Sequence, residues 1–182
     1  MVAYVFLTSV STPYRQDLNL FLLKSPIGEN SQIVQPSVST PTSKTIHDLK
    51  GIFDRVRPEI RKPLSIIDLT GQSPGLIFAA GGKTVGQPWL AGGYGGSESA
   101  MRWVLKSLNP CDRVNSLILV EEHGLRSLPT GVLSGGGWNF DRDYKLLGRV
   151  KIEAGTGFFG EHRIIELFEL KDSTVSKFAH CF

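Results

Sequence analysis

The chain has 182 residues, of which 41% are hydrophobic and 20% charged, and its formal net charge is +3. This length suits one domain, and the composition excludes a chain that is disordered throughout, fibrous or collagen-like. The mild positive charge permits an anionic partner, but the chain lacks the dense stripe of Lys and Arg that marks a dedicated nucleic-acid binder.

The two cysteines, Cys111 and Cys181, are far apart in the sequence and form neither a disulfide framework nor a zinc-binding spacing. We therefore expect reduced thiols in an intracellular, cytoplasmic protein without metal or cofactor. The apolar run at 2–7 lacks the positive region and cleavage site of a signal peptide. No apolar stretch approaches the ~18 residues that span a bilayer, so any membrane contact is expected to be peripheral.

Two apolar runs, 3–10 and 18–23, predict an antiparallel pair of strands at the start of the chain. The stretch over 26–44 lacks hydrophobic periodicity and is rich in Ser, Thr and Pro, which predicts a mobile loop. Apolar residues at helical spacing over 46–56 predict the first amphipathic helix, with Thr45 as its cap.

Strands are predicted over 64–69 and 76–79, and the continuous apolar run at 117–120 predicts a strand buried on both faces. A glycine-rich region with interleaved aromatic residues occupies 71–96. The second amphipathic helix follows directly, with Ser97 as its expected N-cap.

Alternating residues over 146–154 predict a half-buried strand, and 164–170 forms the last predicted strand. The tail from about residue 171 is expected to be loose. Strands at both ends with helices between them predict one α+β domain over 1–182. We expect a mostly antiparallel sheet, two main amphipathic helices and long Gly-rich loops.

No catalytic motif is complete. The tripeptide at 82–84 reads Gly-Lys-Thr but lacks the glycine spacing of a phosphate-binding loop. The enzymatic alternative is a site in which Ser97 or Cys111 acts as nucleophile beside His123 and Asp68. These residue types can form a triad, but nothing in their spacing brings them together. We therefore expect no catalytic site.

Five basic residues lie in or just after the first predicted helix: Lys50, Arg55, Arg57, Arg61 and Lys62. Such a cluster can contact the phosphate groups of RNA or of an anionic membrane. The alternative interpretation is a solvated helix face, whose basic residues complement the C-terminal end of the helix dipole.

Large apolar side chains accompany the glycine-rich segments: Trp89, Leu90, Tyr94 and Trp138. If they are exposed, they suit an interface with a partner or a membrane. If they are buried, the same side chains belong to irregular loops that pack over the hydrophobic core.

Taken together, these features predict a non-enzymatic protein that self-assembles or binds RNA or a membrane surface. These general features are those of a small viral structural or matrix-like protein. The analogy rests on the general features and not on a sequence motif. Two alternatives stay open. One is a small hydrolase or transferase with a cleft under the loop at 71–96, and the other is a module that binds a small ligand or a peptide.

Overall fold

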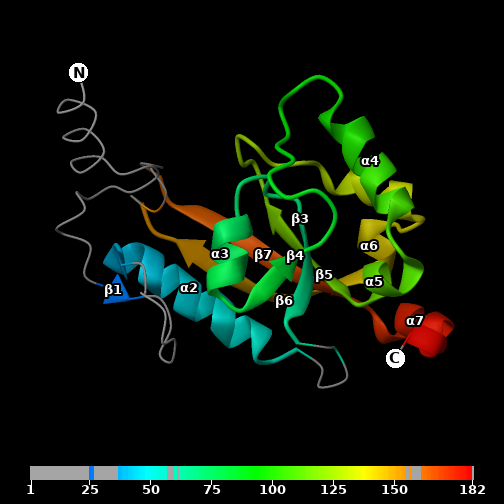
Figure 1. Ribbon diagram of the computed structural model, residues 1–182, viewed down its shortest axis with the longest axis horizontal. Helices are drawn as coiled ribbons and strands as arrows, with labels where there is room; N and C mark the ends of the chain where they lie inside the picture. Colours follow the sequence, from blue (N-terminus) through cyan, green and yellow to red (C-terminus); the bar gives the residue numbers. More distant parts are fainter. Residues whose placement is uncertain are drawn as a thin grey trace.

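The computed structural model describes residues 25–26, 37–56, 60, 62–154, 156 and 161–181 (Figure 1). The helices and strands of these residues are, in chain order, β1 (Ser25–Pro26), β2 (Ser37–Val38), α2 (Thr40–Phe53), β3 (Leu64–Asp68), α3 (Pro74–Ala79), β4 (Gly82–Thr84), α4 (Ser97–Ser107), α5 (Pro110–Val114), β5 (Ser116–Glu121), η2 (Thr130–Gly136), α6 (Phe140–Asp143), β6 (Tyr144–Ile152), β7 (Arg163–Leu170), α7 (Asp172–Val175) and η4 (Ser176–Cys181).

A mixed five-stranded sheet with the order β4-β3-β5-β7-β6 runs through the centre of the molecule (Figure 1). The strand β3 pairs in parallel with β4 and β5, whereas β7 pairs antiparallel with β5 and β6. Parallel neighbours need long crossover connections, and these contain α3 and α4. The chain therefore has both helices and strands, as an α+β fold requires, but only the β5-β7-β6 part of the sheet is antiparallel.

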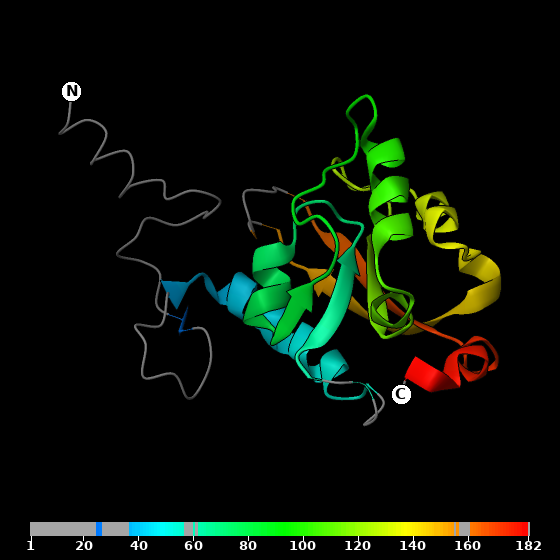
Figure 2. The ribbon, with the colours of Figure 1, turned by 45° about the vertical axis from the view of Figure 1, so that its right-hand side comes forward.

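Helices cover both faces of the sheet, with α2 and α3 on one side and α4 on the other (Figure 2). Neighbouring strand residues alternate between two hydrophobic cores. Ile66 and Leu119 belong to the first core, under α2 and α3, and Ile67 and Ile118 belong to the second core, under α4 and η2. Every residue of β5 is buried, which confirms the prediction of a strand covered on both faces.

The first long helix begins earlier than the sequence pattern predicts. α2 starts at Thr40, and Ser39 caps it by accepting a hydrogen bond from the Thr42 amide. Pro41 lies in the first turn, where its missing N–H has no helical partner to lose. Thr45, the predicted cap, is buried and donates to the Pro41 carbonyl oxygen at 3.0 Å. The loop prediction is therefore wrong for 40–44.

The segment at 76–79 was expected to be a strand but belongs to helix α3. A run of four apolar residues carries too little periodicity to distinguish the two structures, and Pro74 favours a helix start. The predictions at 64–69, 146–154 and 164–170 match the strands β3, β6 and β7.

The strands predicted at 3–10 and 18–23 lie outside the described residues, as do 27–36 of the predicted loop. Within the part of the chain that the structure describes, no helix is long and apolar enough to cross a membrane.

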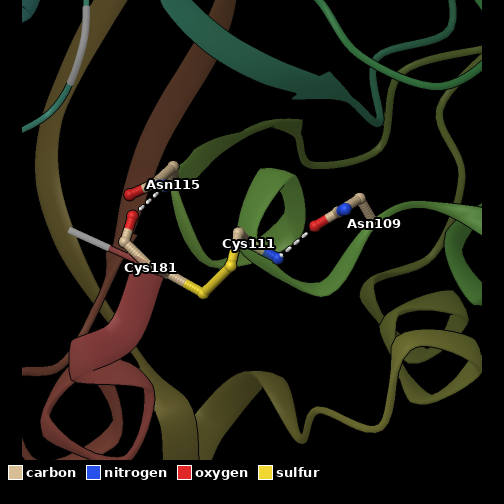
Figure 3. The surroundings of a disulfide bond; sticks show 4 residues. All are labelled: Asn109, Cys111, Asn115 and Cys181. Atoms are coloured by element: carbon tan, nitrogen blue, oxygen red, sulfur yellow. Dashed lines mark hydrogen bonds between the residues drawn. A yellow bond between two sulfur atoms is a disulfide. The ribbon is translucent and has the colours of Figure 1, made fainter.

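A disulfide joins Cys111 of α5 to Cys181 at the end of η4 (Figure 3). Their Cα atoms lie 5.0 Å apart, and the Asn115 side-chain amide donates to the Cys181 carbonyl oxygen at 3.2 Å. The prediction of reduced thiols is wrong, because tertiary folding brings together cysteines that are 70 positions apart. Residues 172–181 form α7 and η4 in place of the loose tail expected there.

Candidate functional site

The connections that follow β3 and β5 diverge to opposite faces of the sheet. The chain after β3 forms α3 against the first core, whereas the chain after β5 leads to η2 against the second core. The carboxyl ends of these neighbouring parallel strands therefore form a topological switch point. Open α/β sheets bind their ligands at such points, so the candidate site is built from the residues that end β3 and β5.

Asp68, the last residue of β3, organises the turn that leads into α3. Its buried carboxylate accepts hydrogen bonds from the amides of Thr70 at 2.9 Å and Ser73 at 3.0 Å, and from the Thr70 hydroxyl at 2.6 Å. Burial raises the pKa of Asp68, and the hydrogen bonds from Thr70 and Ser73 oppose this shift. The amides of this turn therefore bind the Asp68 carboxylate, whereas the corresponding amides of a phosphate-binding turn bind the ligand.

Two glycines allow the connecting loops to pack backbone against backbone above this edge. A Cβ atom at Gly71 would lie 2.3 Å from the Arg126 carbonyl oxygen, and one at Gly92 would lie 2.1 Å from that of Ser127. The Gly92 amide donates to the Arg126 carbonyl oxygen at 2.7 Å. This part of the glycine-rich region at 71–96 is therefore a packed closure of the sheet edge.

Glu121, at the end of β5, is the polar centre of the site. Arg163, the first residue of β7, donates from Nη1 to both carboxylate oxygens of Glu121, at 2.8 Å and 3.0 Å. The Gln72 side chain, from the turn after β3, donates to the same carboxylate at 3.3 Å. The side chains of Glu121 and Arg163 are 1% and 16% exposed, so this ion pair is largely removed from water. Three separate segments of the chain thus meet at one carboxylate.

A hollow of about 910 Å³ lies beside this ion pair. Its walls come from the residues at 121–125, from those at 161–164, and from Arg149 and Glu166. Arg149 of β6 pairs across the hairpin with Glu166 of β7. The hollow is therefore lined by a buried ion pair and by further charged groups.

His123 lies on the rim of this hollow, with its side chain 91% exposed and its Nε2 atom 3.7 Å from a carboxylate oxygen of Glu122. Its backbone has a φ of 61°, in the left-handed region that few non-glycine residues adopt. Ser97 is the first residue of α4, and Gly96 rather than Ser97 is the N-cap. Among the described residues, no hydrogen bond joins His123 to Ser97 or Asp68. Cys111 is disulfide-bonded and offers no free thiol.

Most described residues of the basic cluster contact groups within α2 or at its C-terminal end. Lys50 lies 3.9 Å from Asp54, one helical turn further on, and the Lys62 ammonium group donates to the Phe53 carbonyl oxygen at 2.9 Å. Arg55 is exposed. These contacts favour the interpretation as a solvated helix face with a stabilised C-terminal end. Arg57 and Arg61 lie outside the described residues.

The predicted interface residues divide into exposed and packed side chains. Trp89 and Tyr94 are 52% and 58% exposed, and the Arg126 guanidinium group stacks over the Tyr94 ring at 4.8 Å. Leu90 is half-buried against the second core. Trp138 is buried in that core, so its prediction as an interface residue is wrong. Its ring meets Tyr144 edge to face at 5.9 Å.

The sequence pattern missed the residues that hold the site together. Glu121 directly follows the buried strand predicted at 117–120, a position where functional groups are common. Its main partner, Arg163, is 42 positions away on another strand, and no local signal links the two. Gln72 likewise reaches Glu121 only through the pairing of β3 with β5.

No protein-family model, curated protein sequence or solved structure matches this chain.

Proposed function

We propose that this chain is a binding domain for a small polar molecule, which it holds in the hollow at the carboxyl end of β5. The observation that carries this proposal is the buried Glu121–Arg163 ion pair, because both of its residues line the hollow at the carboxyl end of β5. Ligand sites typically combine a concave surface with a few polar groups that are fixed in position. Gln72 and the two strand ends fix these groups.

The lining of the hollow indicates the chemistry of the ligand. Glu121 accepts hydrogen bonds and Arg163 donates them, so a ligand with both donors and acceptors would be recognised. Leu125 and Ile164, which are 81% and 54% exposed, also line the hollow and would contact an apolar part of the ligand. A nucleoside or an amino acid has this combination of polar and apolar groups.

The ligand is expected to be neutral or positively charged. The amides of the turn after β3 already bind the Asp68 carboxylate, so they do not form a phosphate cradle. Four carboxylates line the hollow, those of Glu121, Glu122, Glu161 and Glu166, against the two guanidinium groups of Arg149 and Arg163. This excess of negative charge disfavours phosphorylated ligands.

Calorimetric titration tests this proposal with adenosine, AMP, arginine and glutamate as probes. We expect adenosine or arginine to bind, and AMP and glutamate to bind more weakly or not at all. Glu121→Gln keeps the shape of the side chain and should weaken binding at least ~10-fold, since it removes a buried charge from the site. The matched control is Glu98→Gln on the exposed face of α4, which should bind like the wild type.

The proposal fails if none of these probes binds, or if Glu121→Gln binds the probe as tightly as the wild type. Stronger binding of AMP than of adenosine would overturn the charge argument while leaving the hollow as the site. Circular dichroism of each variant distinguishes a lost contact from a lost fold.

The other interpretations stay predictions. Self-assembly, or contact with RNA or a membrane, is supported by the exposed Trp89 and Tyr94 and by Arg55. Catalysis in the hollow is supported by His123, whose left-handed backbone is of a kind that collects at functional sites. Neither interpretation has the set of convergent buried groups that supports ligand binding.

A further inference from the structure

Three side chains with the chemistry of zinc ligands meet where the C-terminal segment contacts α5. One ligand atom from each of Cys111, His180 and Cys181 lies within 4.8 Å of the other two. Thiolate sulfur and imidazole nitrogen are the ligands that Zn²⁺ prefers in proteins. The two sulfur atoms are joined as a disulfide in this structure, and Figure 3 shows them between α5 and the end of η4.

We propose that reduction of this disulfide turns the cluster into a Zn²⁺ site. The thiolates of Cys111 and Cys181 and the imidazole of His180 are the three protein ligands, and water completes a tetrahedral set. The same residues thus hold a covalent cross-link under oxidising conditions and a metal cross-link under reducing conditions.

The geometry needs only a small adjustment to accept the metal. Zn–S distances of about 2.3 Å and Zn–N distances of about 2.0–2.1 Å place the two sulfurs and the nitrogen of a tetrahedral set roughly 3.5–3.8 Å apart. The three ligand atoms already lie within 4.8 Å of one another. Movement of side chains is therefore enough to close the site around an ion.

Contacts other than the disulfide hold the two segments together after reduction. The Asn115 side chain, at the end of α5, donates to the Cys181 carbonyl oxygen at 3.2 Å and so joins the two segments (Figure 3). Phe178 packs against the second core from the same C-terminal segment. The ligands therefore remain neighbours when the bond between the sulfurs is broken.

The cluster is open to small reactants, because His180 is exposed and both cysteines are only half-buried. Two molecules of a low-molecular-weight thiol supply the two electrons that break the disulfide, and they leave as one oxidised disulfide. Their two protons pass to the sulfurs of Cys111 and Cys181. Zn²⁺ then displaces both protons as it binds the thiolates. The disulfide and the bound metal exclude each other.

Titration of the full-length chain with Co²⁺, followed by displacement with Zn²⁺, tests this proposal. Protein reduced with a phosphine should show the thiolate-to-cobalt charge-transfer band, and oxidised protein should not. His180→Ala should weaken metal binding at least ~10-fold, because even residues outside the ligand set cost about 10- to 100-fold. His47→Ala, on the exposed surface of α2, is the matched control and should bind like the wild type.

Two results would overturn the proposal: reduced wild-type protein without a thiolate–cobalt band, or His180→Ala with wild-type affinity. Alkylation of the reduced cysteines by iodoacetamide gives a second readout, and Zn²⁺ should slow it in the wild type. Equal alkylation rates with and without Zn²⁺ would also overturn it. Circular dichroism of the reduced protein should be native-like, and unfolding that Zn²⁺ does not reverse counts against the site.

Discussion

Asp143 fixes the start of the β6–β7 hairpin through its carboxylate. Asp143 is 3% exposed, and its carboxylate accepts two hydrogen bonds from the Arg142 guanidinium group, both at 2.8 Å. The Asn139 amide donates a third hydrogen bond, also at 2.8 Å. These contacts, the hydrogen bonds from Arg142 above all, lower the pKa of Asp143 to about 2.

This shift predicts a pH dependence of stability. The folded pKa lies below the ordinary value of 3.8, so the charged carboxylate stabilises the fold above that pH and loses its contribution as the pH falls towards about 2. Linkage sets an upper limit of about 2 kcal/mol, and about 1 kcal/mol is expected because Arg142 is solvent-exposed. Asp143→Asn should flatten the dependence of the unfolding free energy on pH between about 2 and 4.

Urea denaturation at a series of pH values measures this dependence. Asp141→Asn, a change of an exposed carboxylate in the same short helix, is the control and should keep the wild-type slope. A slope in Asp143→Asn equal to that of the wild type would show that the carboxylate does not carry the effect.

At the scale of the elements, the loops above the carboxyl edge of the sheet are held by close backbone contact. A methyl group at Gly92 would lie 2.1 Å from the Ser127 carbonyl oxygen, whereas one at Gly95 would meet no atom within 4 Å. Gly92→Ala should therefore lower the free energy of unfolding by about 1–3 kcal/mol, because the backbone must move. Gly95→Ala should change it by no more than about 0.5 kcal/mol. Denaturant titration of both variants checks the difference, and equal effects would contradict the packed closure.

The elements that could be predicted are those whose own residues carry the signal. The apolar run in β5 and the periodic apolar face of α4 indicate their structures directly. By contrast, β4 is Gly-Lys-Thr and becomes a strand only because its backbone pairs with β3. The residues of the candidate site likewise include some that the sequence could place and some that it could not. His123 could be placed at a strand end, but Arg163 reaches Glu121 through tertiary pairing.

At the scale of the whole molecule, the strand order decides where the site lies. The sheet places β4 and β5 on opposite sides of β3, and this order creates the switch point. The crossover connections that set this strand order depend on the packing of α3 and α4 against different cores. No local sequence pattern indicates that packing. The disulfide also depends on this packing. Disulfides persist in oxidising compartments, so a cytoplasmic location stays a prediction.

The cross-link between Cys111 and Cys181 encloses β5, β6 and β7, which together make up most of the sheet. A disulfide restricts the unfolded chain, and for cysteines 70 positions apart the loop-closure model gives a stabilisation of up to about 4 kcal/mol. The double variant Cys111→Ser, Cys181→Ser should therefore unfold at lower urea concentration than the oxidised wild type. Its native fold should persist, because Val175 and Phe178 pack on the second core without the bond.

Reduction of the wild type in the presence of a chelator provides the control, since it removes the cross-link without changing the composition of the core. Reduced wild type and the double serine variant should then unfold at the same urea concentration. If oxidised wild type and the variant are equally stable, the cysteines do not form a stabilising bond. If the reduced wild type remains more stable than the variant, that part of the difference comes from packing of the thiols and not from restriction of the unfolded chain.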